Sequence, residues 1–149
     1  MDNVEFVYMV GMDEADVARR LEEGFAGVLS LANDGVAYGV PASYHYDGAE
    51  NRLLVRLSDD GESSTVRFLG ETEQASFLLH DVADEDGHSW SVIVCGSLRL
   101  LPDEMFTETE INDLFDPVSV FDEDVADVRI RVAELTPTQV SGRMTAPGQ

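Results

Sequence analysis

The residues best suited to binding chemistry lie between Arg56 and Arg67, where two arginines flank a run of hydroxyl side chains. This run, Ser63-Ser64-Thr65, follows an acidic loop at 59–62 and begins a predicted helix. The first N–H groups of a helix have no partner within it and carry partial positive charge, so nearby hydroxyls add donors for an anion. The same pattern fits ordinary capping by Ser63 or Ser64 with both arginines in water, and from the residues alone capping is the simpler interpretation.

Residue types that carry out catalysis show no useful spacing elsewhere. His45, His80 and His88 are not spaced as metal ligands with one another or with the single cysteine, so we predict no metal site. The sequence contains no nucleophile elbow, no P-loop and no dinucleotide-binding glycine motif. Cys95 has no disulfide partner and lies in an apolar run, so we expect it to be buried and inert. The sequence therefore leaves the catalytic residues unknown.

A series of short strands must position these residues. The turn signals Asn33-Asp34-Gly35 and Asp47-Gly48 separate three apolar runs, and Asp-Gly between such runs favours a β-hairpin because its turn needs positive φ. A first helix is expected at 12–23, with Asp13 as its N-cap and Gly24 after its end. The other helices are predicted at 63–71 and 102–115, and the strands at 26–32, 36–46, 52–58, 75–81, 90–101 and 128–135.

The chain is predicted to form one domain over residues 1–149, because no repeat or linker divides it. The segment from Thr136 onward is rich in turn residues, and we expect it to fray at about 144–149. Six antiparallel strands with peripheral helices favour a mainly β fold, a closed or nearly closed barrel, because closure removes exposed strand edges. A two-layer α+β sheet is the alternative.

The charge balance is extreme, with 30 acidic residues against nine basic ones, all of them arginine, and a net charge of −21. Such self-repulsion destabilises a compact chain in dilute salt, whereas molar salt shortens the screening length to about 3 Å. The composition predicts a protein of a salt-accumulating microbe such as a halophilic archaeon, with an ordinary acidic protein as the alternative. We expect no nucleic-acid partner, since no basic cluster could neutralise phosphates. We also expect no membrane anchor or signal peptide, and therefore a cytoplasmic location.

Five segments carry a family resemblance when they are taken in order. They read GVLS at 27–30, VPASYHYD at 40–47, LVRLS at 54–58, SSTVR at 63–67 and WSVIVCG at 90–96. This order resembles the pyridoxamine 5′-phosphate oxidase-like superfamily of FMN-binding split barrels, most of all its small single-domain members of the nitroimidazole-resistance type. Residues 135–143 also resemble the last strand of the family. The resemblance implies a six-stranded antiparallel split barrel and a homodimer with FMN in two clefts at the subunit interface.

The resemblance also implies which residues bind the cofactor. The backbone at 40–42 would edge the isoalloxazine ring, the residues of the third strand would lie by the ribityl chain and phosphate, and the hydroxyl run would hold the phosphate. Ser91 would approach the flavin from the fifth strand. The implied cofactor-binding residues are Val40, Pro41, Ala42, Arg56, Ser58, Ser63, Ser64, Thr65, Arg67 and Ser91.

The sequence departs from the family pattern at two places. Ser64-Thr65 stands where members carry Arg-Lys or a lone Lys for the phosphate, and Arg67, one helical turn on, is the expected substitute. The tail lacks the Trp and His that grip the substrate in the oxidase proper, so we do not expect a true pyridoxamine 5′-phosphate oxidase. The resemblance implies an FMN-binding protein and a flavin-dependent oxidoreductase of an unknown small molecule. The alternatives are a cofactor-poor dimeric binding or structural module, or haem or a deazaflavin as the ligand.

Overall fold

The computed structural model describes residues 9–59, 64–81, 88–115 and 129–146. The elements follow in the order β1 (Met9–Gly11), α1 (Glu14–Glu23), β2 (Ala26–Asn33), β3 (Val36–Asp47), β4 (Arg52–Asp59), α2 (Ser64–Glu71), β5 (Gln74–Asp81), β6 (Trp90–Leu100), a 3₁₀ turn (Asp103–Met105), α3 (Glu108–Leu114) and β7 (Arg129–Thr145). None of these helices is long and apolar enough to cross a membrane.

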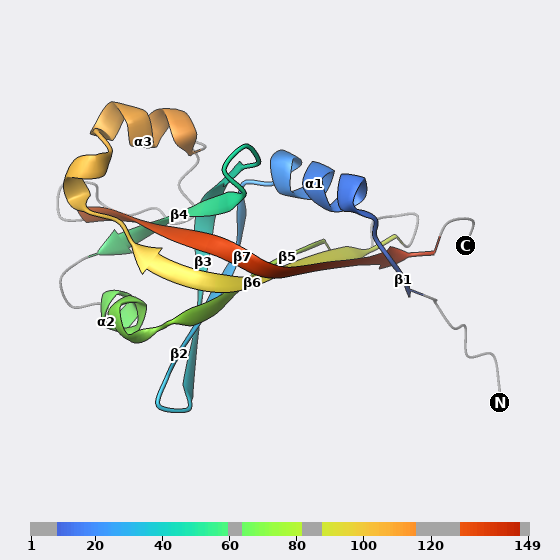
Figure 1. The fold of residues 1–149 in the computed structure, drawn as a ribbon, viewed down its shortest axis with the longest axis horizontal. Helices are drawn as coiled ribbons and strands as arrows, with labels where there is room; N and C mark the ends of the chain where they lie inside the picture. Colours follow the sequence, from blue (N-terminus) through green and yellow to red (C-terminus); the bar gives the residue numbers. More distant parts are fainter. Residues whose placement is uncertain (1–8, 60–63, 82–87, 116–128, 147–149) are drawn as a thin grey trace.

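Six of the strands pair in a ring. Their order is β7-β4-β3-β2-β5-β6, and β6 returns to pair with β7, with every pairing antiparallel. The short β1, which the sequence did not predict, adds to the β4-side edge of β7 near the end of the chain (Figure 1). The ring confirms the predicted six-stranded split barrel and excludes the two-layer alternative.

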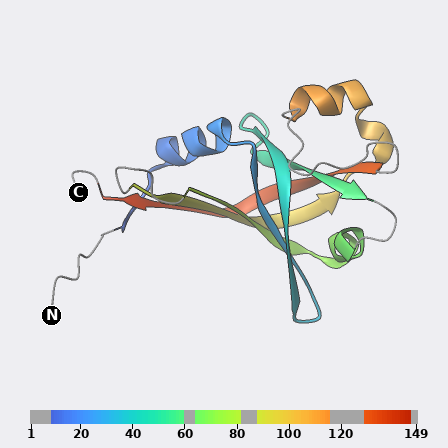
Figure 2. The same cartoon turned by 180° about the vertical axis from the view of Figure 1, so that it is seen from behind.

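The core fills the inside of the ring because apolar residues alternate with polar ones along each strand. Leu29 of β2, Phe77 of β5 and Val94 of β6 are fully buried. Helix α2 packs at one end of the barrel near the projecting β2–β3 hairpin (Figure 2), where Phe68 stacks on Tyr38 with ring centroids 5.0 Å apart. The core and α2 together hold β2, β3 and β4 in place.

The two predicted turns have different outcomes. In the β2–β3 turn, Asp34 and Gly35 both have positive φ, at 50° and 79°, as the predicted hairpin requires. The β3–β4 turn is longer than an Asp-Gly hairpin. Its left-handed residue is Asn51, with φ 52°, and the Asp47 carboxylate accepts a hydrogen bond from the Glu50 N–H at 3.2 Å.

Two predictions about the last third of the chain are wrong. The expected helix at 102–115 is a 3₁₀ turn followed by α3, because Phe106 is extended and Thr107 begins a new helix with a capping box to Glu110. The segment from Thr136, expected from its composition to be rich in turns, is instead the second half of β7, which runs to Thr145, as the resemblance of residues 135–143 to the family's last strand implies. Of the tail expected to fray at about 144–149, residues 147–149 lie outside the described residues. A bulge at Cys95/Gly96 lets β6 keep pairing past Pro137, a residue that cannot donate to the ladder.

Helix α1 contributes Leu21 to the core, whereas α3 lies against the strands from outside it. A small second cluster of Leu54, Leu101, Phe115 and Val132 packs α3 against the outer side of β4 and β7. Helix α1 begins at the predicted N-cap Asp13 and ends at Gly24, and it packs closely on Gly142 of β7. A β-carbon at Gly142 would lie 2.7 Å from the Met12 sulfur, which shows how near the two backbones come.

Candidate functional site

The three β3 residues that the resemblance assigns to the flavin ring alternate in direction. Val40 and Ala42 face the core, where Ala42 is only 4% exposed. Pro41 is exposed and faces away from the core. Only the backbone at positions 40 and 42 is therefore available to a ligand on the outer side of the barrel, which is the role that the resemblance implies for it.

Arg56 and Ser58 lie on the outer side of β4. Arg56 is half-buried between Ser43 of β3 and Val132 of β7, its neighbours in the two ladders. Ser58 is exposed near the end of the strand. The structure thus places both residues on the same surface of the barrel as Pro41, on the strand adjacent to it.

The predicted hydroxyl run is described only in part. Helix α2 begins at Ser64, as predicted, and Thr65 is its second residue, but Ser63 lies outside the described residues and the structure describes neither the Ser64 nor the Thr65 side chain. Arg67 is exposed, and its guanidinium carbon lies 5.6 Å from the centroid of the Phe68 ring. The phosphate role of this run stays a prediction.

Ser91 lies on the outer side of β6, three strands around the ring from Pro41. With neighbouring strands about 4.8 Å apart, that separation is on the order of 14 Å along the sheet. The structure therefore brings the predicted residues of β3 and β4 together. Within one copy of the chain, Ser91 lies far from them. Its direct neighbours are His80 on β5 and Arg143 on β7.

Among the described residues, a large part of the outer surface carries no carboxylate, a feature that sequence reasoning missed. The cross-strand pairs Pro41–Val28, Val28–Leu78 and Leu78–Ile93 form an apolar row over four strands. We call the surface around this row the acid-free face. Its outward residues are Val28, Ser30, Gly39, Pro41, Ser76, Leu78, His80, Ser91, Ile93, Cys95, Gln139, Ser141 and Arg143.

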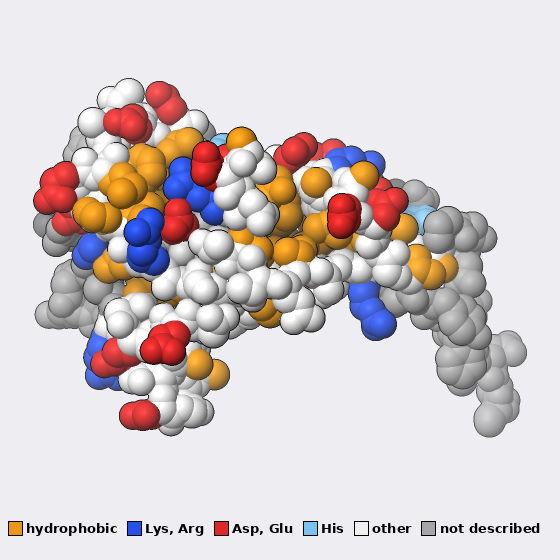
Figure 3. All heavy atoms as spheres, in the orientation of Figure 1, with side chains coloured by type: hydrophobic (Ala, Val, Ile, Leu, Met, Phe, Trp, Pro, Cys, Tyr) orange, Lys and Arg blue, Asp and Glu red, His pale blue; other side chains and the backbone are white. Residues whose placement is uncertain are grey.

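The acid-free face stands out because 30 of the 149 residues are acidic. In the space-filling view of Figure 3, the middle of the molecule over β6 and β7 is mostly white and orange, while red side chains gather on α1, on α3 and below near α2. Cys95 lies on this face and is partly exposed, so the expectation of a buried thiol is wrong. The alternation of Ser30, Ser76 and Ser91 with inward apolar residues was the available signal.

Two of the described arginines have no acidic partner among the residues that the structure describes. Within the described residues, most arginines contact a carboxylate or an aromatic ring: Arg19 with Asp16, Arg20 over Trp90, Arg52 with Asp47 and Glu134, Arg67 over Phe68, Arg99 with Glu134, and Arg131 with Asp103. Arg56 and Arg143 have no ion-pair or hydrogen-bond partner in that part of the chain. Both point outward from the barrel.

The described cavities lie away from the predicted cofactor residues. One of about 660 Å³ lies beneath α1, where Met12, Tyr46 and Val140 line it. It is on the opposite side of the β6–β7 ladder from Ser91. Another of about 580 Å³ lies between the end of α1 and α3, beside Phe25 and His45. Neither of these two cavities is lined by a predicted cofactor residue.

The shifted ionisable groups serve the fold. Burial raises the pKa of Tyr44, whose hydroxyl donates a hydrogen bond of 2.7 Å to the Leu21 carbonyl. The pKa of Asp47 is lowered, first by the hydrogen bond from the Glu50 N–H and then by Arg52, which also contacts Glu134 at 2.8 Å. Among the described residues there is no cluster of His, Cys, Asp and Glu that could hold a metal ion. No shifted group therefore marks a catalytic site.

Known proteins with this fold include flavoproteins. A FAD-binding protein from Mesorhizobium loti superposes with a TM-score of 0.68 at 19% identity, covering 93% of this chain and 99% of its own. A candidate 5-nitroimidazole antibiotic resistance protein from Bacteroides thetaiotaomicron gives 0.65 at 15% identity, covering 97% and 95%. A FAD and haem binding protein from Mycobacterium smegmatis gives 0.62 at 14% identity, covering 89% and 71%. At these identities the likeness establishes the fold alone.

Comparison with curated proteins gives no match. The sequence profile of the family described as pyridoxamine 5′-phosphate oxidase matches residues 13–144, which is nearly the whole chain. This match includes every strand of the ring. The chain therefore belongs to the pyridoxamine 5′-phosphate oxidase-like family.

Proposed function

We propose that this chain binds a flavin nucleotide on the outer side of its barrel, in a cleft that a second copy of the chain completes. The observation that carries the proposal is the acid-free face, with Arg56 near its border, in a chain of net charge −21. A phosphorylated ligand needs a surface without carboxylates, and the flat isoalloxazine ring needs an apolar one. The row of Pro41, Val28 and Leu78 supplies the apolar surface for the ring.

The residues of β3, β4 and α2 fit the parts of such a ligand. The backbone of β3 at 40–42 would border the ring. The guanidinium of Arg56, which no described carboxylate contacts, would neutralise phosphate charge. Arg67 and the N–H groups at the start of α2 would add donors, in place of the lysine usual in the family. The flavin supplies hydride or electron transfer when bound, and the protein supplies binding, orientation and electrostatics. FMN is the form we propose, acting in the reduction or oxidation of a small molecule.

The second copy follows from the shape and charge of the acid-free face. The face is a convex barrel surface rather than a cavity, so a ligand on it stays in water unless something covers it. Two copies of a chain of charge −21 repel each other except where each lacks carboxylates, which favours contact through this face. The exposed Ile93, at 41%, would then be covered. A stable interface needs about 800 Å² from each partner.

Sedimentation in molar KCl tests the dimer. We expect the unmodified chain to sediment as a dimer and Ile93→Asp to shift it toward monomer, because the substitution places one carboxylate from each copy in the contact. Met105→Asp is the matched control, since Met105 is an equally exposed apolar residue, 47%, outside the acid-free face. A monomeric unmodified chain, or equal effects of the two substitutions, would contradict this interface.

Titration of the apoprotein with FMN, FAD and riboflavin tests the cofactor. We expect FMN to bind more tightly than riboflavin, and Arg56→Gln and Arg67→Ala to weaken FMN about tenfold while leaving riboflavin nearly unchanged. Arg99→Gln, an exposed arginine elsewhere on the barrel, is the control. If FMN and riboflavin bind equally well, no phosphate site exists here. Tighter binding of FAD than of FMN would show that FAD is the bound nucleotide.

A second candidate rests on Ser64-Thr65 in place of the family's phosphate-binding lysine. A chain that has lost this cation could persist as a dimeric binding or structural module without a tightly held flavin. The titration separates the two, because no binding of any flavin with an intact dimer would favour the module. The visible spectrum of the purified protein would reveal haem or a deazaflavin in its place.

A further inference from the structure

We propose that His80, Ser91 and Arg143 form a subsite for the anionic group, a carboxylate or a phosphate, of a small planar substrate. The three residues are direct cross-strand neighbours on β5, β6 and β7, since His80 pairs with Ser91 and Ser91 with Arg143. Directly opposed residues have β-carbons about 4.5–5.5 Å apart, so the three polar ends can converge on one small group. The inference rests on the proposed function, because it names what the flavin cleft would accept.

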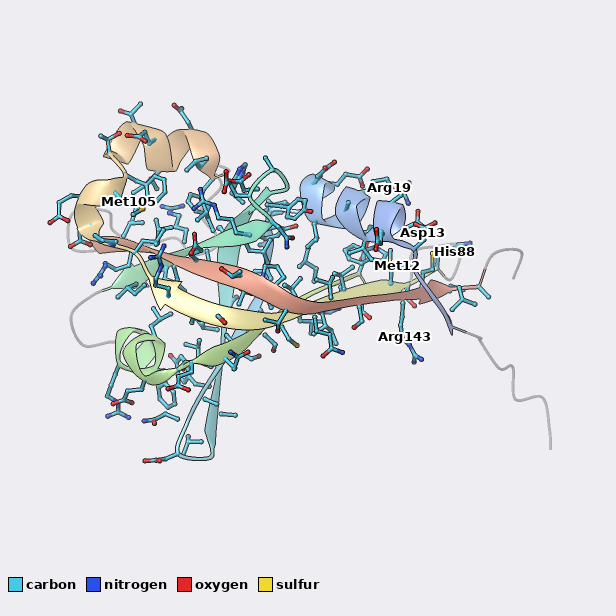
Figure 4. The ribbon with its side chains drawn as sticks, in the orientation of Figure 1. Met12, Asp13, Arg19, His88, Met105 and Arg143 are labelled. Carbon is cyan, nitrogen blue, oxygen red and sulfur yellow. The ribbon has the colours of Figure 1, made fainter. Side chains whose placement is uncertain are left out.

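The side chains of the subsite are accessible, and none of them is paired with another described residue. His80 and Arg143 are exposed, Ser91 is half-exposed, and among the described residues none of the three has a hydrogen-bond or ion-pair partner. Figure 4 shows Arg143 projecting from β7 on the side away from α1, Met12 and Asp13. The residue opposite it on β1 is Gly11, and an added β-carbon there would meet nothing within 4 Å. In a single copy of the chain, the strand position opposite Arg143 therefore leaves open space.

The surroundings indicate an anion with an apolar body. The neighbouring outward row holds Leu78 and Ile93, two positions along the strands from His80 and Ser91, and it continues to Val28 and Pro41. Arg143 keeps its charge available to a ligand, because none of the described outward residues of the acid-free face is acidic. The combination of a guanidinium, an imidazole and a hydroxyl at the edge of an apolar surface suits an aromatic carboxylate or phosphate.

The test uses the apoprotein, with benzoate and its neutral analogue benzamide as probes. Isothermal titration at fixed high ionic strength should show benzoate binding more tightly than benzamide. Arg143→Gln should weaken benzoate about tenfold and leave benzamide unchanged, Ser91→Ala should weaken benzoate less, and Arg143→Lys should restore part of the affinity. Arg99→Gln, on the same β6–β7 ladder but paired with Glu134, should change neither probe. The thermal midpoint of each variant checks that it remains folded.

Three results would overturn the subsite: equal affinities for benzoate and benzamide, an Arg143→Gln variant that binds benzoate as the unmodified chain does, or equal losses in the Arg99→Gln control. A fall in the preference for FMN over riboflavin in Arg143→Gln would also overturn it, because the anion would then be the cofactor's own phosphate. Failure of the flavin titration with an intact benzoate response would refute the proposed cofactor and leave the anion subsite standing.

Discussion

Gly24 and Tyr44 offer a sharp test of how α1 is joined to the barrel. The buried Tyr44 hydroxyl donates to the Leu21 carbonyl at 2.7 Å, and a β-carbon at Gly24 would lie 2.3 Å from that same oxygen. The backbone at Gly24, with φ −81° and ψ 165°, is one that alanine adopts freely, so the substitution is opposed by the collision alone. Gly24→Ala should therefore lower the free energy of unfolding by about 1–3 kcal/mol through overpacking.

Tyr44→Phe should lower the free energy of unfolding by a similar amount for a different reason. It leaves the Leu21 carbonyl buried without its donor, which costs about 1–3 kcal/mol. In the double variant the colliding oxygen is gone, and the nearest remaining side-chain contact of the new β-carbon is Leu79 at 3.0 Å. The double variant should then lose little more than Tyr44→Phe alone, an interaction of about 1–2 kcal/mol between the two sites.

Urea unfolding of all four proteins in molar KCl measures this interaction. The potassium salt keeps the acidic surface screened at every urea concentration, which a guanidinium titration would not hold constant. Losses that add to within about 0.5 kcal/mol would refute the geometry at this junction. Gly24→Ala with unchanged stability would refute it as well.

Two further predictions concern the same scaffold. The pKa of Asp47 is lowered in the folded chain, so its carboxylate stabilises the fold fully at pH values above the unfolded pKa of about 3.9, and this contribution is lost as the pH falls through the folded pKa. Asp47→Asn should therefore make stability fall less steeply on acid titration. An unchanged acid profile would contradict this. Gly142→Val should push Met12 and Val17 away from β7, because its new β-carbon would lie 2.7 Å from the Met12 sulfur and 2.9 Å from a Val17 methyl carbon. Hydrogen exchange of the α1 amides should then rise while the amides of the barrel strands stay protected. Unchanged protection of α1 would count against the packing.

Local turn and capping chemistry made the first half of the fold predictable. Asp13 and Gly24 bound α1 as their residue types indicate, and Asp34-Gly35 sets the β2–β3 turn through positive φ. The end of the chain was harder, because the strand character of the segment after Thr136 depends on distant partners. Only pairing with β6 across a bulge shows that Pro137 can lie within a strand.

The candidate site was predictable in type but not in arrangement. The segments with family resemblance named β3, β4, α2 and β6, yet the distance of Ser91 from Pro41 depends on strand order, which no local pattern gives. The acid-free face could not be predicted from the sequence for the same reason, since Val28, Leu78 and Ile93 come from three separate strands. A list of outward residues becomes a surface only when the register is known.

In the sequence, β7 follows every other strand of the ring, and this order has a consequence for synthesis. This strand of 17 residues pairs with β4 on one side and with β6 on the other, so it is the piece that turns an open sheet into a ring. Until the ribosome releases residues 129–145, β4 and β6 both present bare edges to the crowded cell. The nascent polypeptide therefore cannot close the ring before residues 129–145 have emerged, and synthesis that stopped before them would leave an aggregation-prone sheet.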